Sequence, residues 1–467
     1  MLSEEFSAVH LIGIGGTGLS AIARLLMESG CKVSGSDQML SPLARSLQEA
    51  GATVYQGHRA ENIQGAKLVI RSSAIQDDNV EVQAAQAAGI PVVKRSDFLG
   101  RLMENQTGIA VAGTHGKTTT TAMAAWMLTV MNQDPSYIIG GVPVNLGNNA
   151  HAGKGSFFVI EADEYDRMFL GLHPKVAIVT NIEHDHPDCY PTEAEFYQAF
   201  HDFAYGLDSR GWLVACADDH GASRLAEQVH LEGYQVLTYG SGPSRADYMA
   251  RSIKPNSRGG FSFTAAYQGS SIGKVNLRVP GLHNVNNALA VLVIAHLLEL
   301  PLALARQALS DFEGTGRRFE VRGVVAGVTV IDDYAHHPTE IKATLSAARS
   351  RYHQKRIWAV WQPHTYSRTR ELFDAFVKAF GDADCVVVTE VYAAREASQI
   401  GTFSARQIVD AMASDKVVFI PGNEQAVEFL LDNLHPEDVM IVMSAGDADQ
   451  ISTQVLKALA ERKGLHV

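Results

Sequence analysis

Two glycine-rich turns, each set between a short apolar run and a helical pattern, most strongly limit the folds open to this chain of 467 residues. The first turn is GIGGTG, residues 13–18, and the second is GTHGKT, residues 113–118. The order of strand, glycine turn and helix is that of a unit in a parallel β-sheet. Two such turns, 100 residues apart, predict at least two α/β domains in series.

The strand–helix alternation continues along the whole chain. Apolar runs such as AVHLIGI and KLVIRSSA alternate with helical patterns up to about residue 105, a second series starts at GIAVAGTHGKTT, and a third starts near Arg318. Between Tyr239 and Val279, short strands and turns indicate a small antiparallel addition, and a helix is expected at 285–298. At roughly 150 residues per domain, the length fits three domains.

We therefore predict an α/β protein with three domains. Residues 1–106 form a Rossmann-like domain, residues 107–316 a P-loop ATPase-like domain with a mostly parallel sheet, and residues 317–467 a second Rossmann-like α/β domain.

Charge and composition exclude several classes of protein. The formal net charge of −12 argues against nucleic acid as the main partner. The four cysteines form no CxxC pair, which favours a reducing compartment. The N-terminus has acidic residues where a signal peptide needs positive charge, and no stretch approaches about 18 apolar residues. We expect a cytoplasmic protein that does not cross a membrane.

The first glycine turn matches G-x-G-x-x-G, and Asp37 follows at the end of the next apolar run. Such a turn lets a pyrophosphate approach the backbone at a helix N-terminus. It fits NAD, with Asp37 on a ribose hydroxyl, and it fits any other diphosphate nucleotide equally well, including a UDP-sugar. A turn without any ligand also remains open.

The second turn resembles a shortened phosphate-binding loop, with Val111 where the full Walker spacing has glycine. Backbone N–H groups, the lysine of Gly116-Lys117-Thr118 and the threonine hydroxyl are the groups that a triphosphate and Mg²⁺ need. The next strands end in EADE and NIEHDHPD, which bring Glu161 and His186 to the same edge of the sheet. The sequence predicts an ATP and metal site there.

Three later clusters leave alternatives open. Asn284 and Asn287 lie at the start of a helix, where they contact an adenosine or where Asn284 simply caps the helix. Arg318 at the expected domain junction either reaches the transferring phosphate or forms a solvated pair with Arg317. DDYAHHPTE and QPHTYSRTREL follow strands and resemble a site for a substrate carboxylate.

Together these motifs resemble the Mur ligase family, the ATP-dependent amide-forming enzymes of peptidoglycan synthesis, and the resemblance covers nearly the whole chain. Its carriers are GIGGTGLS, GSD, SSAI, GTHGKTTTT, EADEYD, TNIEHDHPD, GLHNVNNALA, RRFE, DDYAHHPTE, QPHTYSRTREL and TEVYAAREA. His115 and the last two motifs are similar to the branch that adds L-alanine. Thr365 departs from that branch, which commonly has arginine there.

The resemblance implies a role for each matching residue. Catalysis would rest on Lys117, Glu161, His186, Arg318 and, as the general base, His337. ATP would contact Gly113, Thr114, His115, Gly116, Lys117, Thr118, Thr119, Asn284, Asn287, Arg318 and Asp333. Mg²⁺ would be held by Thr118, Glu161 and His186. UDP-N-acetylmuramate and L-alanine would contact Gly15, Gly16, Thr17, Gly18, Asp37, Ser72, Ser73, His115, Tyr334 and Arg368.

Other functions remain as alternatives. A recycling ligase that attaches a murein tripeptide to the same sugar nucleotide shares GTHGKTTT. An NAD-dependent oxidoreductase would use the first turn and Asp37 but leave Lys117, Glu161 and His186 without a task. A non-catalytic nucleotide-binding regulator would not need the metal-site acids. The expected partners are small-molecule substrates, with a monomer or homodimer as the assembly.

Overall fold

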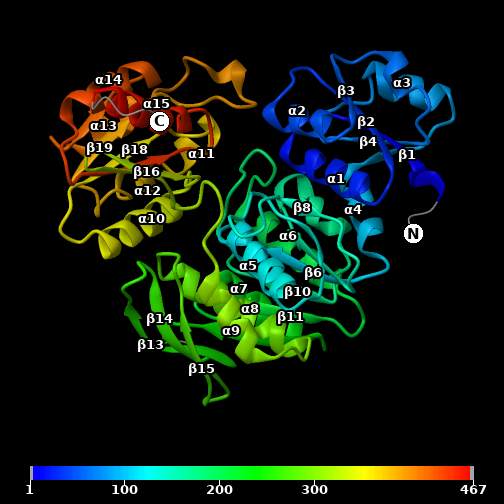
Figure 1. Ribbon diagram of the computed structural model, residues 1–467, viewed down its shortest axis with the longest axis horizontal. Helices are drawn as coiled ribbons and strands as arrows, with labels where there is room; N and C mark the ends of the chain where they lie inside the picture. Colours follow the sequence, from blue (N-terminus) through cyan, green and yellow to red (C-terminus); the bar gives the residue numbers. More distant parts are fainter. Residues whose placement is uncertain (1–3, 244, 463–467) are drawn as a thin grey trace.

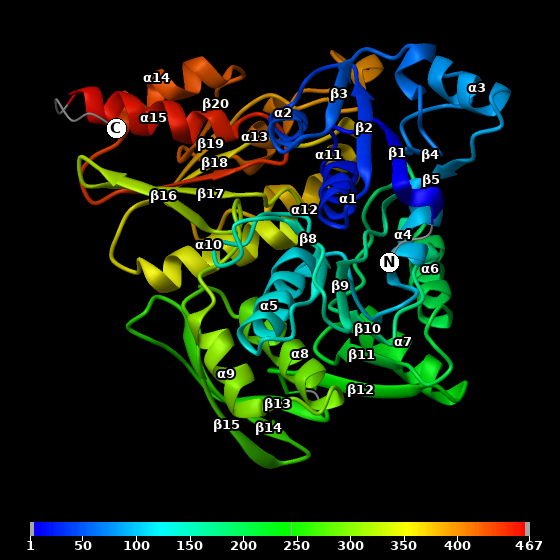
Figure 2. The ribbon, with the colours of Figure 1, turned by 45° about the vertical axis from the view of Figure 1, so that its right-hand side comes forward.

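The computed structural model describes residues 4–243 and 245–462, and the chain folds into three units with one β-sheet each. Figure 1 shows the N-terminal and C-terminal units side by side above the larger central unit, and Figure 2 shows the same arrangement turned by 45°. The predicted α/β class is confirmed. The predicted domain borders after residues 106 and 316 fall between the sheets but stay predictions.

The N-terminal unit is a parallel five-stranded sheet in the order β3-β2-β1-β4-β5. Its strands are β1 (Ala8–Ile12), β2 (Lys32–Asp37), β3 (Thr53–Gln56), β4 (Leu68–Arg71) and β5 (Val92–Lys94). Its helices are η1 (Glu4–Ser7), α1 (Thr17–Glu28), α2 (Pro42–Glu49), η2 (Ala60–Ile63), α3 (Val80–Ala87) and α4 (Arg95–Met103). The strand order reverses at β1, so the glycine turn after β1 lies at the switch point where such sheets bind ligands.

The central unit is a ten-stranded sheet in the order β15-β14-β13-β12-β11-β10-β6-β9-β7-β8. Its strands are β6 (Thr107–Ala112), β7 (Ser136–Ile138), β8 (Ala150–His151), β9 (Phe157–Glu161), β10 (Val176–Val179), β11 (Trp212–Cys216), β12 (Gln235–Gly240), β13 (Tyr248–Pro255), β14 (Phe261–Tyr267) and β15 (Ser270–Asn276). Its helices are α5 (Lys117–Val130), η3 (Tyr165–Gly171), α6 (Glu193–Tyr205), α7 (His220–Leu231), α8 (His283–Leu297) and α9 (Leu302–Asp311).

The predicted antiparallel addition is confirmed as β13–β15, and these strands extend the central sheet rather than forming a separate one. Helix α8 begins at His283, two residues before the predicted start. It is buried along most of its length, as its apolar sequence indicates, and packs on α5. The helix that follows the phosphate-binding loop is therefore fixed from behind by a buried helix.

The C-terminal unit is a six-stranded sheet in the order β16-β17-β21-β18-β19-β20, parallel except for β16. Its strands are β16 (Glu320–Val325), β17 (Val328–Asp333), β18 (Ile357–Trp361), β19 (Cys385–Val388), β20 (Val417–Phe419) and β21 (Val439–Met443). Its helices are α10 (Pro338–Arg351), α11 (Tyr366–Glu371), α12 (Phe373–Val377), η4 (Ala397–Gln399), α13 (Arg406–Met412), α14 (Asn423–Asn433) and α15 (Asp449–Arg462).

Both faces of the C-terminal sheet are covered, which explains its continuous apolar strands. In β18, Ile357, Ala359 and Trp361 point into one hydrophobic cluster, whereas Trp358 and Val360 point into the other. Polar side chains are thus left to the strand ends and loops. Within residues 4–243 and 245–462, every helix is too short or too polar to span a lipid bilayer.

Candidate active site

The loop after β6 turns so tightly that two of its positions require glycine. Gly113 has φ of 133° and Gly116 has φ of 83°, both in the region that other residues rarely adopt. A Cβ atom at Gly113 would lie 2.0 Å from the hydroxyl oxygen of Thr180, and one at Gly116 would lie 2.9 Å from Oδ1 of Asn287. Val111 is buried in β6, outside the turn, so the loop needs no glycine at that position. The shortened loop is therefore a well-defined turn and not a Walker motif that has lost a residue.

The segment after β10 holds the loop in place. The Thr180 hydroxyl donates to the carbonyl oxygen of His115 at 2.6 Å, and the His115 N–H donates to Oδ1 of Asn181 at 2.8 Å. The Thr114 hydroxyl donates to the carbonyl oxygen of Glu183 at 2.8 Å. Three hydrogen bonds within the protein therefore fix the loop conformation.

Lys117 is held inside this loop. Its Nζ donates to the carbonyl oxygen of Gly113 at 2.6 Å and lies 2.8 Å from Oε2 of Glu164. Burial alone would lower the pKa of Lys117, but the carboxylates of Glu164, Asp163 and Glu161 outweigh burial and raise it. The ammonium group therefore stays charged, as phosphate binding requires.

A hydroxyl and a carboxylate meet beside Lys117. The Thr118 hydroxyl donates to Oε1 of Glu161 at 2.8 Å, and the Gly140 N–H donates to Oε2 at 2.6 Å. Oxygen donors of this kind suit Mg²⁺, so the first pair of predicted metal ligands fits the ion.

His186, the third predicted metal ligand, is expected to share an ion with Glu161, but its carboxylate neighbour is Glu164. Nε2 of His186 lies 3.6 Å from Oε1 of Glu164, and its Nδ1 is buried without a hydrogen-bond partner among the described residues. Glu164 is not among the predicted site residues, although it follows Glu161 within the motif EADEYD. Glu164 is the carboxylate that joins Lys117 and His186, and its side chain is buried.

Arg318 reaches the loop from the start of the C-terminal unit. Its NH2 group lies 3.5 Å from the Thr118 hydroxyl, its NH1 group lies 3.7 Å from Oε1 of Glu340, and its guanidinium stacks over the Tyr334 ring. Arg317 instead donates to the carbonyl oxygen of Ser444. The alternative of a solvated Arg317–Arg318 pair is therefore wrong, because both side chains have protein partners.

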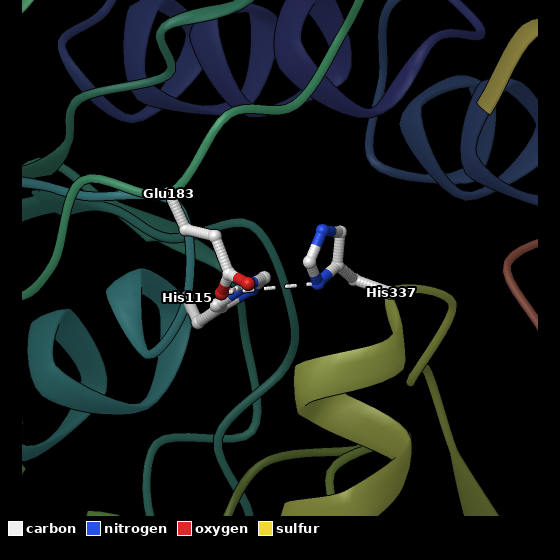
Figure 3. A group of neighbouring side chains, drawn as sticks. All are labelled: His115, Glu183 and His337. Carbon is white, nitrogen blue, oxygen red and sulfur yellow. Dashed lines mark hydrogen bonds and ion pairs between the residues drawn. The ribbon is translucent and has the colours of Figure 1, made fainter. Parts of the chain in front are cut away.

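A charged cluster joins the central and C-terminal units (Figure 3). His115 Nε2 lies 3.0 Å from Oε2 of Glu183, and the same oxygen lies 3.9 Å from Nδ1 of His337, which caps the start of α10. On its other side, His115 Nδ1 lies 3.3 Å from Oε1 of Glu340. Burial alone would lower the pKa of His115, but the two carboxylates raise it to about 9.

The three groups in Figure 3 lie within 4.8 Å of one another, close enough to surround a metal ion. The charges are already balanced without an ion, because the carboxylates of Glu183 and Glu340 face two cations: a protonated His115 lies between them, and Arg318 lies 3.7 Å from Oε1 of Glu340. Nδ1 of His337 also accepts the Thr339 N–H at 3.3 Å, which competes with metal ligation. We therefore interpret this cluster as an ion-pair contact between two units.

Two predicted site residues of the C-terminal unit, Arg368 for the amino acid and Asp333 for ATP, have hydrogen-bond partners within the protein. Arg368 donates from Nε to Oδ1 of Asp185 at 2.7 Å, and both side chains are buried. The carboxylate of Asp333 accepts the N–H groups of Phe319 and Ala335, and burial raises its pKa to about 6. Arg368 thus contacts the segment that carries His186.

A cavity of about 290 Å³ lies behind the loop and is lined by His115, Gly116, Thr118, Asn284, Asn287, Arg318 and Asp333, among others. Asn284 does not cap α8, because that helix begins at His283 and its N-cap position is Leu282. Its side-chain amide donates to the carbonyl oxygen of Pro280 and accepts from Asn287. The capping alternative is therefore wrong, and both asparagines face the cavity.

A second cavity of about 790 Å³ joins all three units. Its lining includes Thr17 and Gly18 from the first glycine turn, Lys117 from the loop, and Tyr334 and Arg368 from the C-terminal unit. The predicted residues Gly15, Gly16, Asp37, Ser72 and Ser73 are not among its lining residues.

Asp37 has a partner in the glycine turn itself. Its Oδ2 accepts the Gly15 N–H at 2.9 Å, and the Ser41 hydroxyl donates to the Gly15 carbonyl oxygen at 2.9 Å. Helix α1 has no side-chain cap at Gly16. The first N–H groups of α1 are therefore available to an anion, whereas one Asp37 oxygen is engaged in shaping the turn.

Models of known families match three parts of the chain. Residues 8–107 match the description "Mur ligase family, catalytic domain", residues 111–295 match "Mur ligase middle domain", and residues 317–446 match "Mur ligase, glutamate ligase domain".

Curated relatives match over nearly the full length. A UDP-N-acetylmuramate–L-alanine ligase from Desulforamulus reducens is 42% identical over 467 residues, covering 99% of this chain and 100% of the relative. One from Caldanaerobacter subterraneus is 40% identical, covering 97% and 98%. Among solved structures, UDP-N-acetylmuramate–alanine ligase from Thermotoga maritima matches with a TM-score of 0.82 at 29% identity, covering 97% of this chain and 99% of that one. A murein peptide ligase from Psychrobacter arcticus matches with a TM-score of 0.71 at 27% identity, covering 97% and 98%.

Proposed function

Because this chain belongs to the Mur ligase family, we propose that it joins L-alanine to the lactyl carboxylate of UDP-N-acetylmuramate, with hydrolysis of ATP to ADP and phosphate. The observation that carries this proposal is the cavity of about 790 Å³, whose lining includes Thr17 and Gly18 of the first glycine turn, Lys117 and Arg368. One cavity lined by all three units suits a sugar nucleotide, a triphosphate and an amino acid that must react with one another.

The reaction needs an activated carboxylate. The lactyl carboxylate attacks the γ-phosphate of ATP, which gives an acyl phosphate and ADP, and the amine of L-alanine then displaces phosphate. Lys117 lies inside the phosphate-binding loop and Arg318 reaches the Thr118 hydroxyl from the C-terminal unit, so both are suited to neutralise charge on the transferring phosphate. Mg²⁺ held by Thr118 and Glu161 would neutralise further phosphate charge. Together these residues mainly position the reacting groups and neutralise the phosphate charge, as phosphoryl transfer requires.

The ammonium group of L-alanine must lose a proton before its nitrogen can attack the acyl phosphate. His337 is buried, and burial lowers its pKa to about 4, so its imidazole is neutral at neutral pH. A pKa this low makes the resting imidazole a weak base, so His337 would take the proton only with Glu183, 3.9 Å from its Nδ1, stabilising the charge that results. We propose His337 as the base on these grounds.

Several predictions from the sequence belong to this proposal. The sequence predicts that His186 and Glu161 hold a second Mg²⁺; because Nε2 of His186 lies 3.6 Å from Oε1 of Glu164, we propose that Glu164 also contributes to this site. Residues 1–106, 107–316 and 317–467 would act as the UDP-sugar, ATP and amino-acid domains, a division supported by the one sheet in each range. The protein would work in the cytoplasm as a monomer or homodimer.

The main competing function is the attachment of a whole peptide to the same sugar nucleotide, which other members of the family carry out. The assay is ADP release in the presence of UDP-N-acetylmuramate, with L-alanine, glycine, L-serine and a murein tripeptide offered in turn. The proposal predicts turnover that requires the sugar nucleotide and is fastest with L-alanine. Faster turnover with the tripeptide would assign the chain to the recycling function, and ADP release without the sugar nucleotide would reject both.

A further inference from the structure

Arg95, the first residue of α4, has no assigned role, although its side chain lies against the first glycine turn. A Cβ atom at Gly18 would lie 1.5 Å from NH1 of Arg95. The last glycine of GIGGTG thus leaves the room that the guanidinium occupies, on the first turn of α1. Gly18 has an ordinary backbone conformation, since it is absent from the residues with positive φ. A side chain at position 18 would therefore displace the guanidinium of Arg95 from its place.

The positive charge of Arg95 is poorly neutralised. Its Nε and NH2 groups contact the sulfur of Met168, which is a weak acceptor, and its nearest carboxylate oxygen is that of Asp163, at 3.8 Å. Its side chain is only 19% exposed. Burial lowers the pKa of Arg95, and Asp163 and Asp166 only partly offset that effect.

The helix next to Arg95 adds to this imbalance. The N-terminus of α1 carries partial positive charge and uncapped N–H groups, so a cation beside it is unfavourable unless an anion lies between them. Thr17, Gly18 and Arg95 line the large cavity, as Lys117 does, and the guanidinium lies directly against Gly18. An anion in the cavity beside Gly18 would contact both the helix and the guanidinium.

We infer that Arg95 binds the diphosphate of the sugar-nucleotide substrate, an inference that rests on the proposed function. The guanidinium gives up its weak contact with the Met168 sulfur and donates to phosphate oxygens, while the first N–H groups of α1 bind the same diphosphate. A planar guanidinium suits phosphate oxygens in pairs. The remaining pairing with Asp163, two residues after Glu161, connects the bound diphosphate to the ATP site.

The test compares ligands that differ only in phosphate. Binding of UDP and of uridine to the full-length protein is measured by calorimetry for wild type, R95Q, R95K and the neighbouring control K94Q, in which an exposed positive charge is removed. R95Q is expected to weaken UDP binding roughly 10- to 100-fold, the range for a charge-assisted hydrogen bond. R95Q is expected to bind uridine with wild-type affinity, and K94Q is expected to bind UDP with wild-type affinity. R95K is expected to restore part of the UDP affinity that R95Q loses.

Kinetics and a second variant separate binding from folding. R95Q should raise the KM for UDP-N-acetylmuramate while the KM for ATP stays within about 3-fold. G18A, whose methyl group displaces the guanidinium, should reproduce the loss, and the G18A/R95Q double variant should lose little more than either single variant.

The possible failures can be told apart. If R95Q binds UDP like wild type, or if it loses UDP and uridine equally, the role of Arg95 is rejected while the proposed function stands. If the wild type binds UDP tightly but does not turn over UDP-N-acetylmuramate, the proposed function is rejected while the diphosphate contact stands. If the wild type binds no UDP, both are rejected.

Discussion

The ammonium group of Lys117 is stabilised by oxygen acceptors of the protein, and it is proposed to bind the anionic oxygens of a triphosphate. In the described structure its ammonium group is paired with Glu164 and with two carbonyl oxygens of its own loop. A triphosphate offers several anionic oxygens and can replace these contacts. Glu164 also faces His186, so a movement of Lys117 towards phosphate would leave that carboxylate free for a cation.

K117A tests the division between the two nucleotide sites. The variant removes the charge nearest the expected phosphates, so kcat should fall by roughly 10³-fold. The Kd of UDP-N-acetylmuramate should stay within about 3-fold of wild type, because the first glycine turn is untouched. Single-turnover acyl-phosphate formation and calorimetry measure the two quantities, with K154A at an exposed position as the control. Comparable loss of both would reject the division.

Glu81 is a second buried charge, in helix α3 of the N-terminal unit. Its carboxylate accepts from Ser36 at 2.5 Å and Asn62 at 2.6 Å, and it lies 3.7 Å from His10. Burial alone would raise the pKa of Glu81, but hydrogen bonds from His10, Ser36 and Asn62 outweigh burial and lower it to about 2. The carboxylate therefore ties β1 and β2 to α3.

Because the folded pKa is depressed, Glu81 stabilises the N-terminal unit fully above about pH 4.5, and this contribution is lost as the pH falls towards 2. E81A should lower the local unfolding free energy by about 2–3 kcal/mol, since partners in the core lose their acceptor. Hydrogen exchange of the β2 amides measures that free energy, with the exposed E49A as control. Equal pH dependence in E81A and wild type would contradict this role.

At the scale of elements, the site depends on turns that end strands. The loop between β6 and α5 is tied to the end of β10, and its two positive-φ glycines touch Thr180 and Asn287. Conformation and packing are therefore both specified at these positions, and a change at either one disturbs the neighbouring element.

G113A should weaken ATP binding at least 10-fold, because the added methyl group conflicts with the Thr180 hydroxyl in addition to the unfavourable φ. The matched control is G147A, which has φ of 71° and open space around it, and thus isolates the backbone effect. Calorimetry with ADP compares the two. Equal affinities for G113A and G147A would mean that the contact with Thr180 is unimportant.

Much of this element order could be predicted because it is local in the sequence. Strand, glycine turn and helix are adjacent in the chain, so GTHGKT and GIGGTG indicate their own structure. The roles of Arg95, Glu164 and Glu340 could not be predicted, because each depends on a neighbour from another element or unit: Gly18, His186 and His115. For Asn284, a local pattern suggests a wrong role. Asparagine near a helix start is a typical capping residue, but Asn284 lies inside α8, which begins at His283.

At the scale of the whole molecule, the segment after β10 joins the central unit to the C-terminal unit. Glu183 accepts the Thr339 hydroxyl at 2.7 Å, Asp185 pairs with Arg368 at 2.7 Å, and Asp188 pairs with Arg395 at 2.6 Å. The pair of His115 and Glu340 adds a contact from the loop itself. The described arrangement is thus held by charges that also line the proposed site.

The pH dependence of this contact has a definite sign. The pKa of His115 is raised to about 9, so its stabilising contribution is fully present below about pH 6.5 and is lost as the pH rises through 9. Groups facing His115 include Glu183, Glu340, His337, His283 and Arg318. Wild type should therefore expand between pH 7 and 10, as measured by the radius of gyration in small-angle scattering, and H115Q should lack that transition. An identical transition in H115Q would contradict the assignment.

The most direct measurement of the central claim follows oxygen from the substrate. UDP-N-acetylmuramate labelled with ¹⁸O in its lactyl carboxylate is incubated with the protein, ATP and L-alanine, and the products are analysed by mass spectrometry. Attack of the carboxylate on the γ-phosphate predicts a UDP-N-acetylmuramoyl-alanine product and one ¹⁸O atom in each phosphate released. An unlabelled phosphate, or the absence of the alanine-containing product, would contradict the proposed reaction.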